Sequence, residues 1–139
     1  MRLGEVLSRL GMTYVKTLDR SHRHYLVRDG DGNLFILIFT NRTLRKPKSL
    51  GIDYEGEMFG LKRHYIDYYL RTGNYAGVIW VYSGDAYIAD SYAVREVVAL
   101  LKTCVKRGFE VICHYPVKSA KRVPLNDGLT KFYKTMGCQ

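Results

Sequence analysis

The sequence contains few cysteines and no long apolar run. No apolar segment approaches the roughly 20 residues that a membrane helix needs, and residues 1–12 lack the continuous apolar segment of a signal peptide. We therefore expect no membrane association and an intracellular, cytoplasmic location. The three cysteines form no CxxC pair and no disulfide framework, which is typical of a reducing compartment. Cys113 and His114 would need metal ligands from elsewhere, so no metal site is predicted there.

Acidic residues are scarce relative to basic ones. The chain has 22 Lys and Arg against 13 Asp and Glu, which gives a formal net charge of +9. This excess favours a polyanionic partner. Nucleic acid fits better than an anionic membrane, because no predicted helix has a basic face opposite a strongly apolar one. A chain of 139 residues, 47% of them hydrophobic, is expected to form one domain with one core.

Residues 24–40 predict a β-hairpin at the centre of a sheet. The cluster Asp29-Gly-Asp-Gly-Asn33 favours a tight turn between two runs rich in β-branched and aromatic residues. The second run, 34–39, is apolar at every position. A strand of that kind is buried on both faces and therefore belongs in the middle of a sheet.

The rest of the pattern predicts helices that alternate with strands. We expect an α/β fold, with a mixed central sheet flanked by helices and a long helix that connects two buried strands. The predicted elements are a helix at 3–10, a strand at 13–18, the hairpin, a helix at 53–71, a strand pair at 75–82 and 85–89, a helix from Asp90 or Ser91 whose apolar stripe extends to Val105, a strand at 109–115 and a helix from about Pro124.

Basic residues gather in two segments that we predict to be loops, at 41–51 and after residue 116, and on the predicted long helix. We expect them to contact phosphates, which positions a nucleic-acid backbone without reading its bases. The candidate binding residues are Arg42, Arg45, Lys46 and Lys48 in the first segment, Lys62 and Arg63 on the helix, and Lys118, Lys121 and Arg122 in the second segment.

Three acidic residues stand at the start of the predicted long helix: Asp53, Glu55 and Glu57. The partial positive charge at a helix N-terminus stabilises carboxylates there. This explanation is favoured over a metal site.

The element order, the hairpin and two further segments resemble one nuclease superfamily. In Phe59–Tyr82 a predicted helix is followed by a glycine-containing turn and an apolar strand, and Arg107–Pro116 precedes the predicted last helix. These features resemble the PD-(D/E)XK, or restriction-endonuclease-like, superfamily, and within it the RecU-type Holliday junction resolvases, also called penicillin-binding-protein-related factor A. The resemblance implies a restriction-endonuclease-like fold, a DNA partner with branched or bent forms included, and a homodimer.

Most of the catalytic residues of that superfamily are absent from this sequence. Its chemistry uses an Asp at the start of the first hairpin strand and Glu-x-Lys at the end of the second, where the carboxylates hold Mg²⁺. These positions correspond to His24, Ile38 and Thr40 here, and only Glu5, on the first helix, matches a carboxylate of the pattern. We therefore expect a DNA-binding protein with a nuclease-like fold, no metal site and no cofactor.

Three alternatives remain open. The first is an active Mg²⁺-dependent endonuclease whose displaced site combines Glu5 with the acids at 53–57. Across the alternatives, the candidate catalytic residues are Glu5, His24 and Glu57. The second is metal-free acid/base cleavage of RNA by His22 and His24 with a nearby Tyr or Lys. The third is a protein-interaction module that uses its 12 tyrosines for association.

Overall fold

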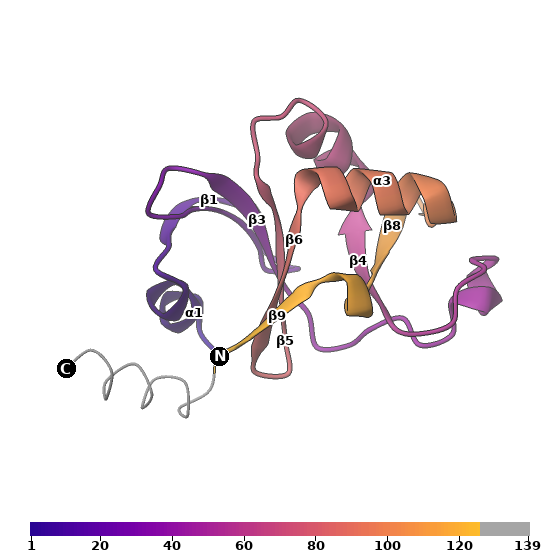
Figure 1. Ribbon diagram of the computed structural model, residues 1–139, viewed down its shortest axis with the longest axis horizontal. Coiled ribbons are helices and arrows are strands. Elements are labelled where there is room, and N and C mark those ends of the chain that lie inside the picture. The colour runs from indigo at the N-terminus through magenta and orange to yellow at the C-terminus, as the bar shows by residue number, and fades with distance from the viewer. Residues whose placement is uncertain (126–139) are drawn as a thin grey trace.

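The computed structural model describes residues 1–125, which form two β-sheets and a small number of helices (Figure 1). The larger sheet has the strand order β1 (Thr13–Asp19), β2 (His24–Arg28), β3 (Leu34–Phe39), β5 (Gly77–Tyr82), β6 (Asp85–Asp90) and β9 (Lys121–Pro124). The smaller sheet has the order β4 (Met58–Lys62), β8 (Glu110–Pro116) and β7 (Val105–Arg107). The helical elements are α1 (Leu3–Leu10), η1 (Pro47–Leu50), α2 (Arg63–Tyr65), η2 (Ile66–Leu70), α3 (Ser91–Leu101) and η3 (Val117–Ser119).

The predicted hairpin is confirmed, with β2 and β3 antiparallel and His24 opposite Ile38. Its turn is held by the carboxylate of Asp29, which accepts hydrogen bonds from the backbone N–H groups of Asp31 at 3.0 Å and Asn33 at 2.8 Å. Gly32 adopts a φ of 87°, a left-handed conformation that glycine reaches without steric cost. The turn cluster therefore fixes the register of both strands.

The two apolar strands are buried on both faces, as their sequences predict. β3 and β5 are parallel neighbours, and β5 then pairs antiparallel with β6, so the larger sheet is mixed. On one face Leu37 and Ile79 pack in a cluster with Val6 of α1. On the other face Ile36 and Val78 belong to the cluster that includes residues of α3 and of the smaller sheet.

The elements form layers on both sides of the larger sheet (Figure 1). α1 covers one face, while α3 and the smaller sheet with β4 and β8 cover the other. The architecture is therefore α/β with a mixed sheet. Within residues 1–125, no helix is long and apolar enough to cross a membrane.

The predicted helix at 53–71 is wrong over its first half. Residues 58–62 form strand β4, which pairs with β8, and only 63–70 are helical, in a short α-helical turn followed by a π-helical turn. Phe59 explains the error, because it is fully buried and stacks on Trp80, with ring centroids 5.1 Å apart. Met58 and Phe59 are consecutive and both fully buried, whereas the buried residues of a surface helix recur every three or four positions. Gly60, a poor helix former, lies between Phe59 and Leu61.

Two further boundaries differ from the predictions. α3 ends at Leu101, because Lys102 takes a left-handed conformation, and Val105 belongs to strand β7 instead of the helix. The second basic segment is not an open loop: residues 121–124 pair with β6 as strand β9. Pro124 therefore ends a strand, the buried Leu125 after it is not helical, and the predicted last helix from 126 on lies outside the described residues.

The expectation of no disulfide is also wrong, because Cys104 and Cys113 are bonded to each other. The register of the β7–β8 hairpin pairs Val105 with Ile112, so the residues immediately outside that pair face each other. Cysteine spacing alone does not reveal a hairpin register. The argument for a reducing compartment from unpaired cysteines therefore no longer holds.

Replacement of Gly77 by alanine is expected to destabilise the fold. A Cβ at this position would lie against the carbonyl oxygen of Ala89 and 2.9 Å from the Cα of Asp90 on β6. Because both contacts are with backbone atoms, β5 and β6 would have to move apart. We therefore expect a loss of at least about 2 kcal/mol in the free energy of unfolding. Urea denaturation measures the change.

Gly4→Ala is the matched control. A Cβ on Gly4 of α1 would meet no atom within 4 Å. The free energy of unfolding of this variant is therefore expected to equal that of the wild type or to be slightly higher. Equal stability of the Gly77 and Gly4 variants would contradict the close approach of β5 and β6.

Candidate functional site

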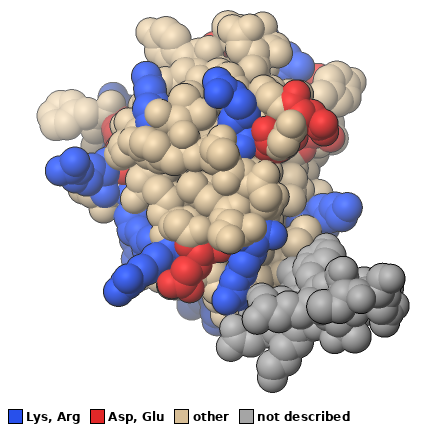
Figure 2. Space-filling view, turned by 90° about the vertical axis from the view of Figure 1, so that its left-hand side faces the viewer, with Lys and Arg blue, Asp and Glu red and all other residues tan. Residues whose placement is uncertain are grey.

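Positive charge is not confined to one patch on the face of the molecule shown in Figure 2. On the face shown in Figure 2, which lies on the α1 side, Lys and Arg side chains surround much of the rim and Asp and Glu form smaller groups. Net charge alone therefore does not locate a site, and the candidate site has to come from geometry.

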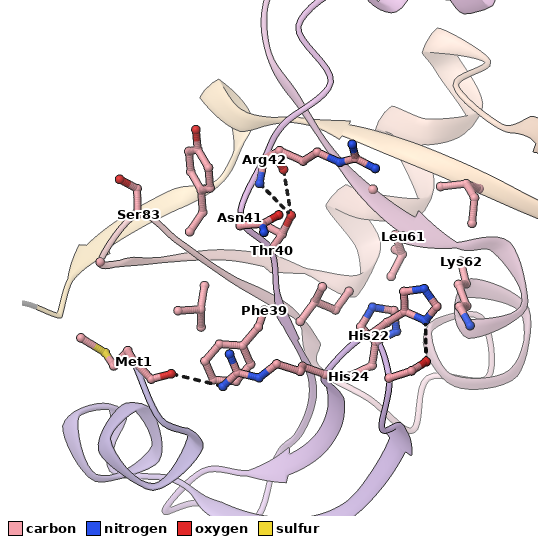
Figure 3. Close-up of a pocket in the computed structure, with 18 of the residues that line it drawn as sticks. Met1, His22, His24, Phe39, Thr40, Asn41, Arg42, Leu61, Lys62 and Ser83 are labelled. Atoms are coloured by element: carbon pink, nitrogen blue, oxygen red, sulfur yellow. Dashed lines mark hydrogen bonds between the residues drawn. The ribbon is translucent and has the colours of Figure 1, made fainter.

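A cavity of about 850 Å³ opens where several strands end (Figure 3). Its walls come from the start of β2, the end of β3 and the residues after it, the end of β5 with the following turn, β4 and the start of β8. The three positions that the nuclease resemblance singles out, His24, Ile38 and Thr40, all line this cavity. The hairpin register therefore brings them together as expected.

The fourth position does not join them. Glu5 is exposed on α1 and does not line the cavity, and neither do Asp53, Glu55 or Glu57. Within residues 1–125, no group of three or more His, Cys, Asp or Glu side chains is arranged to hold a metal ion.

Glu55 and Glu57 contact the preceding loop instead. Glu55 pairs with the ammonium group of Lys48 at 3.3 Å, and Glu57 accepts a hydrogen bond from the hydroxyl of Thr43 at 2.8 Å. Because no helix begins at Asp53, the helix-dipole explanation for these acids is wrong.

Cationic side chains outnumber carboxylates in the cavity wall. Arg23, Arg42 and Lys62 line it, and Glu110 is the acidic residue among the lining side chains. Arg23 takes a φ of 57°, an uncommon value for a residue other than glycine. Its guanidinium group lies 3.9 Å from the ring centroid of Phe39 and donates to the backbone oxygen of Met1 at 3.2 Å. The turn conformation and the stacking together hold this cation at the cavity.

Lys62 is not a free surface cation. Only 13% of its side chain is exposed, and its ammonium group lies 2.7 Å from the carboxylate of Asp19 and 3.1 Å from that of Glu110. The hydrogen bond from Lys62 holds the pKa of Asp19 well below its usual range. Burial opposes the charge on Lys62, but the hydrogen bonds to both carboxylates outweigh it and raise the pKa of this ammonium group.

His24 forms a second polar pair at the cavity. Its Nδ1 lies 2.9 Å from the hydroxyl of Tyr65 on α2. Burial lowers the pKa of His24 to about 4 and raises the pKa of Tyr65 to about 12, so both side chains are neutral at pH 7.

His22 forms a third pair, in the tight turn between β1 and β2. Its Nδ1 lies 2.9 Å from the Asp19 carboxylate, which also accepts hydrogen bonds from the backbone N–H of His22 at 3.1 Å and the hydroxyl of Ser21 at 2.9 Å. The rings of His22 and His24 are 5.9 Å apart. Asp19 therefore connects His22 to Lys62 within one hydrogen-bonded cluster.

The structure divides the nine predicted phosphate-binding residues into groups. Arg42 and Lys62 line the cavity, whereas Arg45, Lys46 and Lys48 lie in the exposed segment between β3 and β4. Ion pairs engage Arg45 with Glu57, Lys48 with Glu55, Arg63 with Asp67 and Arg122 with Asp85. Lys118 is exposed on η3, and Lys121 is exposed on β9 beside Arg122.

Sequence patterns did not identify Asp19, Arg23 or Tyr65 as site residues. Asp19 and Arg23 belong to a segment, 19–23, that the sequence presents only as a polar turn. One local signal was present: an Asp three residues before a His, at the end of a strand, can bind both the backbone and the ring of that His. Tyr65 has no such signal, because its contact with His24 depends on the path of the chain after β4.

Comparison with protein-family models, curated proteins and solved structures finds no match to this chain. The chemistry of the cavity residues is therefore the basis for a functional proposal.

The ring of His24 is expected to titrate near pH 4, which NMR can follow through its imidazole proton shifts. Because the usual pKa is 6.5 and the folded value is about 4, the unfolded chain binds this proton first as the pH falls. The stability that this ring contributes is therefore complete above pH 6.5 and is lost as the pH falls towards 4. A His24→Asn variant should lose less stability over that interval. A midpoint near 6.5 in the folded protein would contradict the burial of this ring.

Proposed function

We propose that this chain is a nucleic-acid-binding domain with a restriction-endonuclease-like core that binds phosphates at the cavity and the adjoining basic segment. The observation that carries the proposal is the cavity wall, which Arg23 and Arg42 line in addition to Lys62, whose charge is paired with Asp19 and Glu110. Cations placed around a concave surface concentrate positive potential there and attract a polyanion. Phosphate contacts of this kind act on DNA, branched DNA included, and on RNA.

The strand arrangement supports the nuclease-like part of the proposal. A helix, α1, precedes three antiparallel strands, β1 to β3, and a crossover then leads to β5 in parallel beside β3. This is the order on which the resemblance rests. The crossover contains a strand and short helical turns in place of the single long helix that we expected.

The cavity residues favour binding over metal-dependent cleavage. Ile38, at the position of the superfamily's Glu, is apolar and almost fully buried, and Glu5 is not part of the wall. The nearby carboxylates of Asp19 and Glu110 are both engaged by the ammonium group of Lys62. Mg²⁺ prefers oxygen ligands with negative charge, which this wall does not offer in excess.

Affinity for duplex DNA is expected to fall steeply with salt. If roughly 4–6 phosphates are contacted, log K should fall by about 0.9 per contact for each log unit of salt. The variant Arg23→Ala, Arg42→Ala, Lys46→Ala removes two cavity cations and one exposed loop cation. It should weaken binding and reduce the slope by up to about 3, as measured by fluorescence anisotropy at several salt concentrations.

The control variant, Lys16→Ala, Arg28→Ala, Lys106→Ala, removes the same charge from exposed positions on β1, β2 and β7 outside the cavity wall. It should retain most of the slope. Equal losses in the two variants would show that binding follows net charge instead of this site, and no binding at low salt would overturn the proposal.

Restoring the superfamily's residues tests the register of the nuclease-like core. Because His24, Ile38 and Thr40 line one cavity, the variant His24→Asp, Ile38→Glu, Thr40→Lys should create a divalent-metal site. Ile38→Glu alone should destabilise the fold, because it buries a carboxylate without a partner. The melting temperature of the triple variant should rise with Mg²⁺ or Mn²⁺, since a ligand that binds only the folded state stabilises it. A folded triple variant that responds to neither metal would contradict the register.

A further inference from the structure

Five polar side chains from separate parts of the chain meet at one side of the cavity. Asp19 and His22 come from the β1–β2 turn, His24 from β2, Lys62 from β4 and Tyr65 from α2. Three of them, His22, His24 and Lys62, line the cavity side by side (Figure 3). Binding of a phosphate backbone does not require this arrangement, because two of the five are held neutral and Lys62 is already paired.

His22 has the geometry of a proton-transfer group. Asp19 binds its Nδ1, which leaves Nε2 as the nitrogen available to a ligand. A carboxylate on one imidazole nitrogen orients the ring and stabilises the imidazolium that forms when the other nitrogen takes a proton. Lys62 keeps Asp19 ionised for that role. Since 66% of the His22 side chain is exposed, a substrate in the cavity can reach it.

The two groups next to His22, namely His24 and Lys62, are placed to stabilise the negative charge that develops on a phosphate as it reacts. His24 stays neutral at pH 7 and is fixed through Nδ1 by the hydroxyl of Tyr65, so its Nε2 is the nitrogen left to meet a phosphate oxygen. The Lys62 ammonium group, held in place by two carboxylates, is a hydrogen-bond donor in the same wall. Donors and charges held in place before reaction are the usual source of stabilisation for a more highly charged transition state.

We propose that this cluster cleaves RNA without a metal ion, using His22 to transfer the proton. Nε2 of His22 takes the proton of a 2′-hydroxyl, and the 2′-oxygen attacks the adjacent phosphorus. The bond from phosphorus to the 5′-oxygen breaks, and His22 returns the proton to the departing 5′-oxygen. The products are a 2′,3′-cyclic phosphate and a 5′-hydroxyl, with no water or oxidant consumed. DNA lacks the 2′-hydroxyl and cannot react this way.

This inference rests on the proposed binding of nucleic acid, and the experiment separates the two. A labelled single-stranded RNA and a DNA of the same sequence are incubated with the protein in EDTA. Binding is measured by anisotropy, and products are identified by their 2′,3′-cyclic phosphate ends. We expect both strands to bind and only RNA to be cleaved. An RNA with one 2′-deoxy residue should resist cleavage at that residue, a result that does not depend on any protein variant.

His22→Ala should slow cleavage at least about 100-fold while binding and melting temperature stay close to those of the wild type. Tyr92→Ala is the control, because Tyr92 is an exposed ring on α3 and lies outside the cavity wall. Binding without cleavage, or cleavage that persists in His22→Ala, would overturn this inference and leave the proposed function intact. Absence of binding to both strands would overturn both.

Discussion

The parallel pair of β3 and β5 buries both of its faces, and the rest of the fold follows from that constraint. An apolar strand pair at the centre of a sheet needs a covering layer on each side. α1 supplies one layer, and α3 with the smaller sheet supplies the other. The covering ends where the strands end, because the residues after Phe39 and Tyr82 leave the sheet. The cavity forms there, with Ile38 as its buried floor and polar residues in the wall around it.

Lys62 connects the two sheets electrostatically. It belongs to β4 of the smaller sheet, and its ammonium group binds Asp19 at the end of β1 in the larger sheet as well as Glu110 at the start of β8. A charge removed from water costs several kcal/mol unless partners compensate it. Two carboxylates at hydrogen-bond distance provide that compensation. The same contact fixes Asp19, and through Asp19 it orients His22, so one ion pair serves both the fold and the candidate site.

The sequence predicted those parts of the fold that depend on local chemistry. The turn residues of the hairpin and the uninterrupted apolar runs of β3 and β5 specify their own structure, and the register that placed residues 24, 38 and 40 together follows from them. The prediction failed where a partner distant in sequence decides the outcome. Residues 58–62 become a strand because β8 supplies backbone partners, and Cys104 meets Cys113 because β7 and β8 pair.

The same distinction applies to the site. His22 and His24 could be named from the sequence, but Tyr65, Asp19 and the pairing of Lys62 could not, because each contact joins segments that local patterns do not connect. The hydrogen bonds from Tyr65 to His24 and from Lys62 to Asp19 span 41 and 43 residues. A binding residue predicted from charge alone, such as Lys62, acquires a different role once its carboxylate partners are known.

The charge balance of the cavity decides whether its wall favours a phosphate group or a divalent cation. A site with two carboxylates repels phosphate until a divalent cation neutralises them. Here His24 is neutral and Ile38 is apolar, so neither residue adds negative charge to the wall. Arg23 and Arg42 also line the wall, whereas the charge of Lys62 is compensated by Asp19 and Glu110. The proposed attraction for phosphate therefore rests on the two arginines, and the chemistry proposed for this wall is proton transfer between fixed side chains.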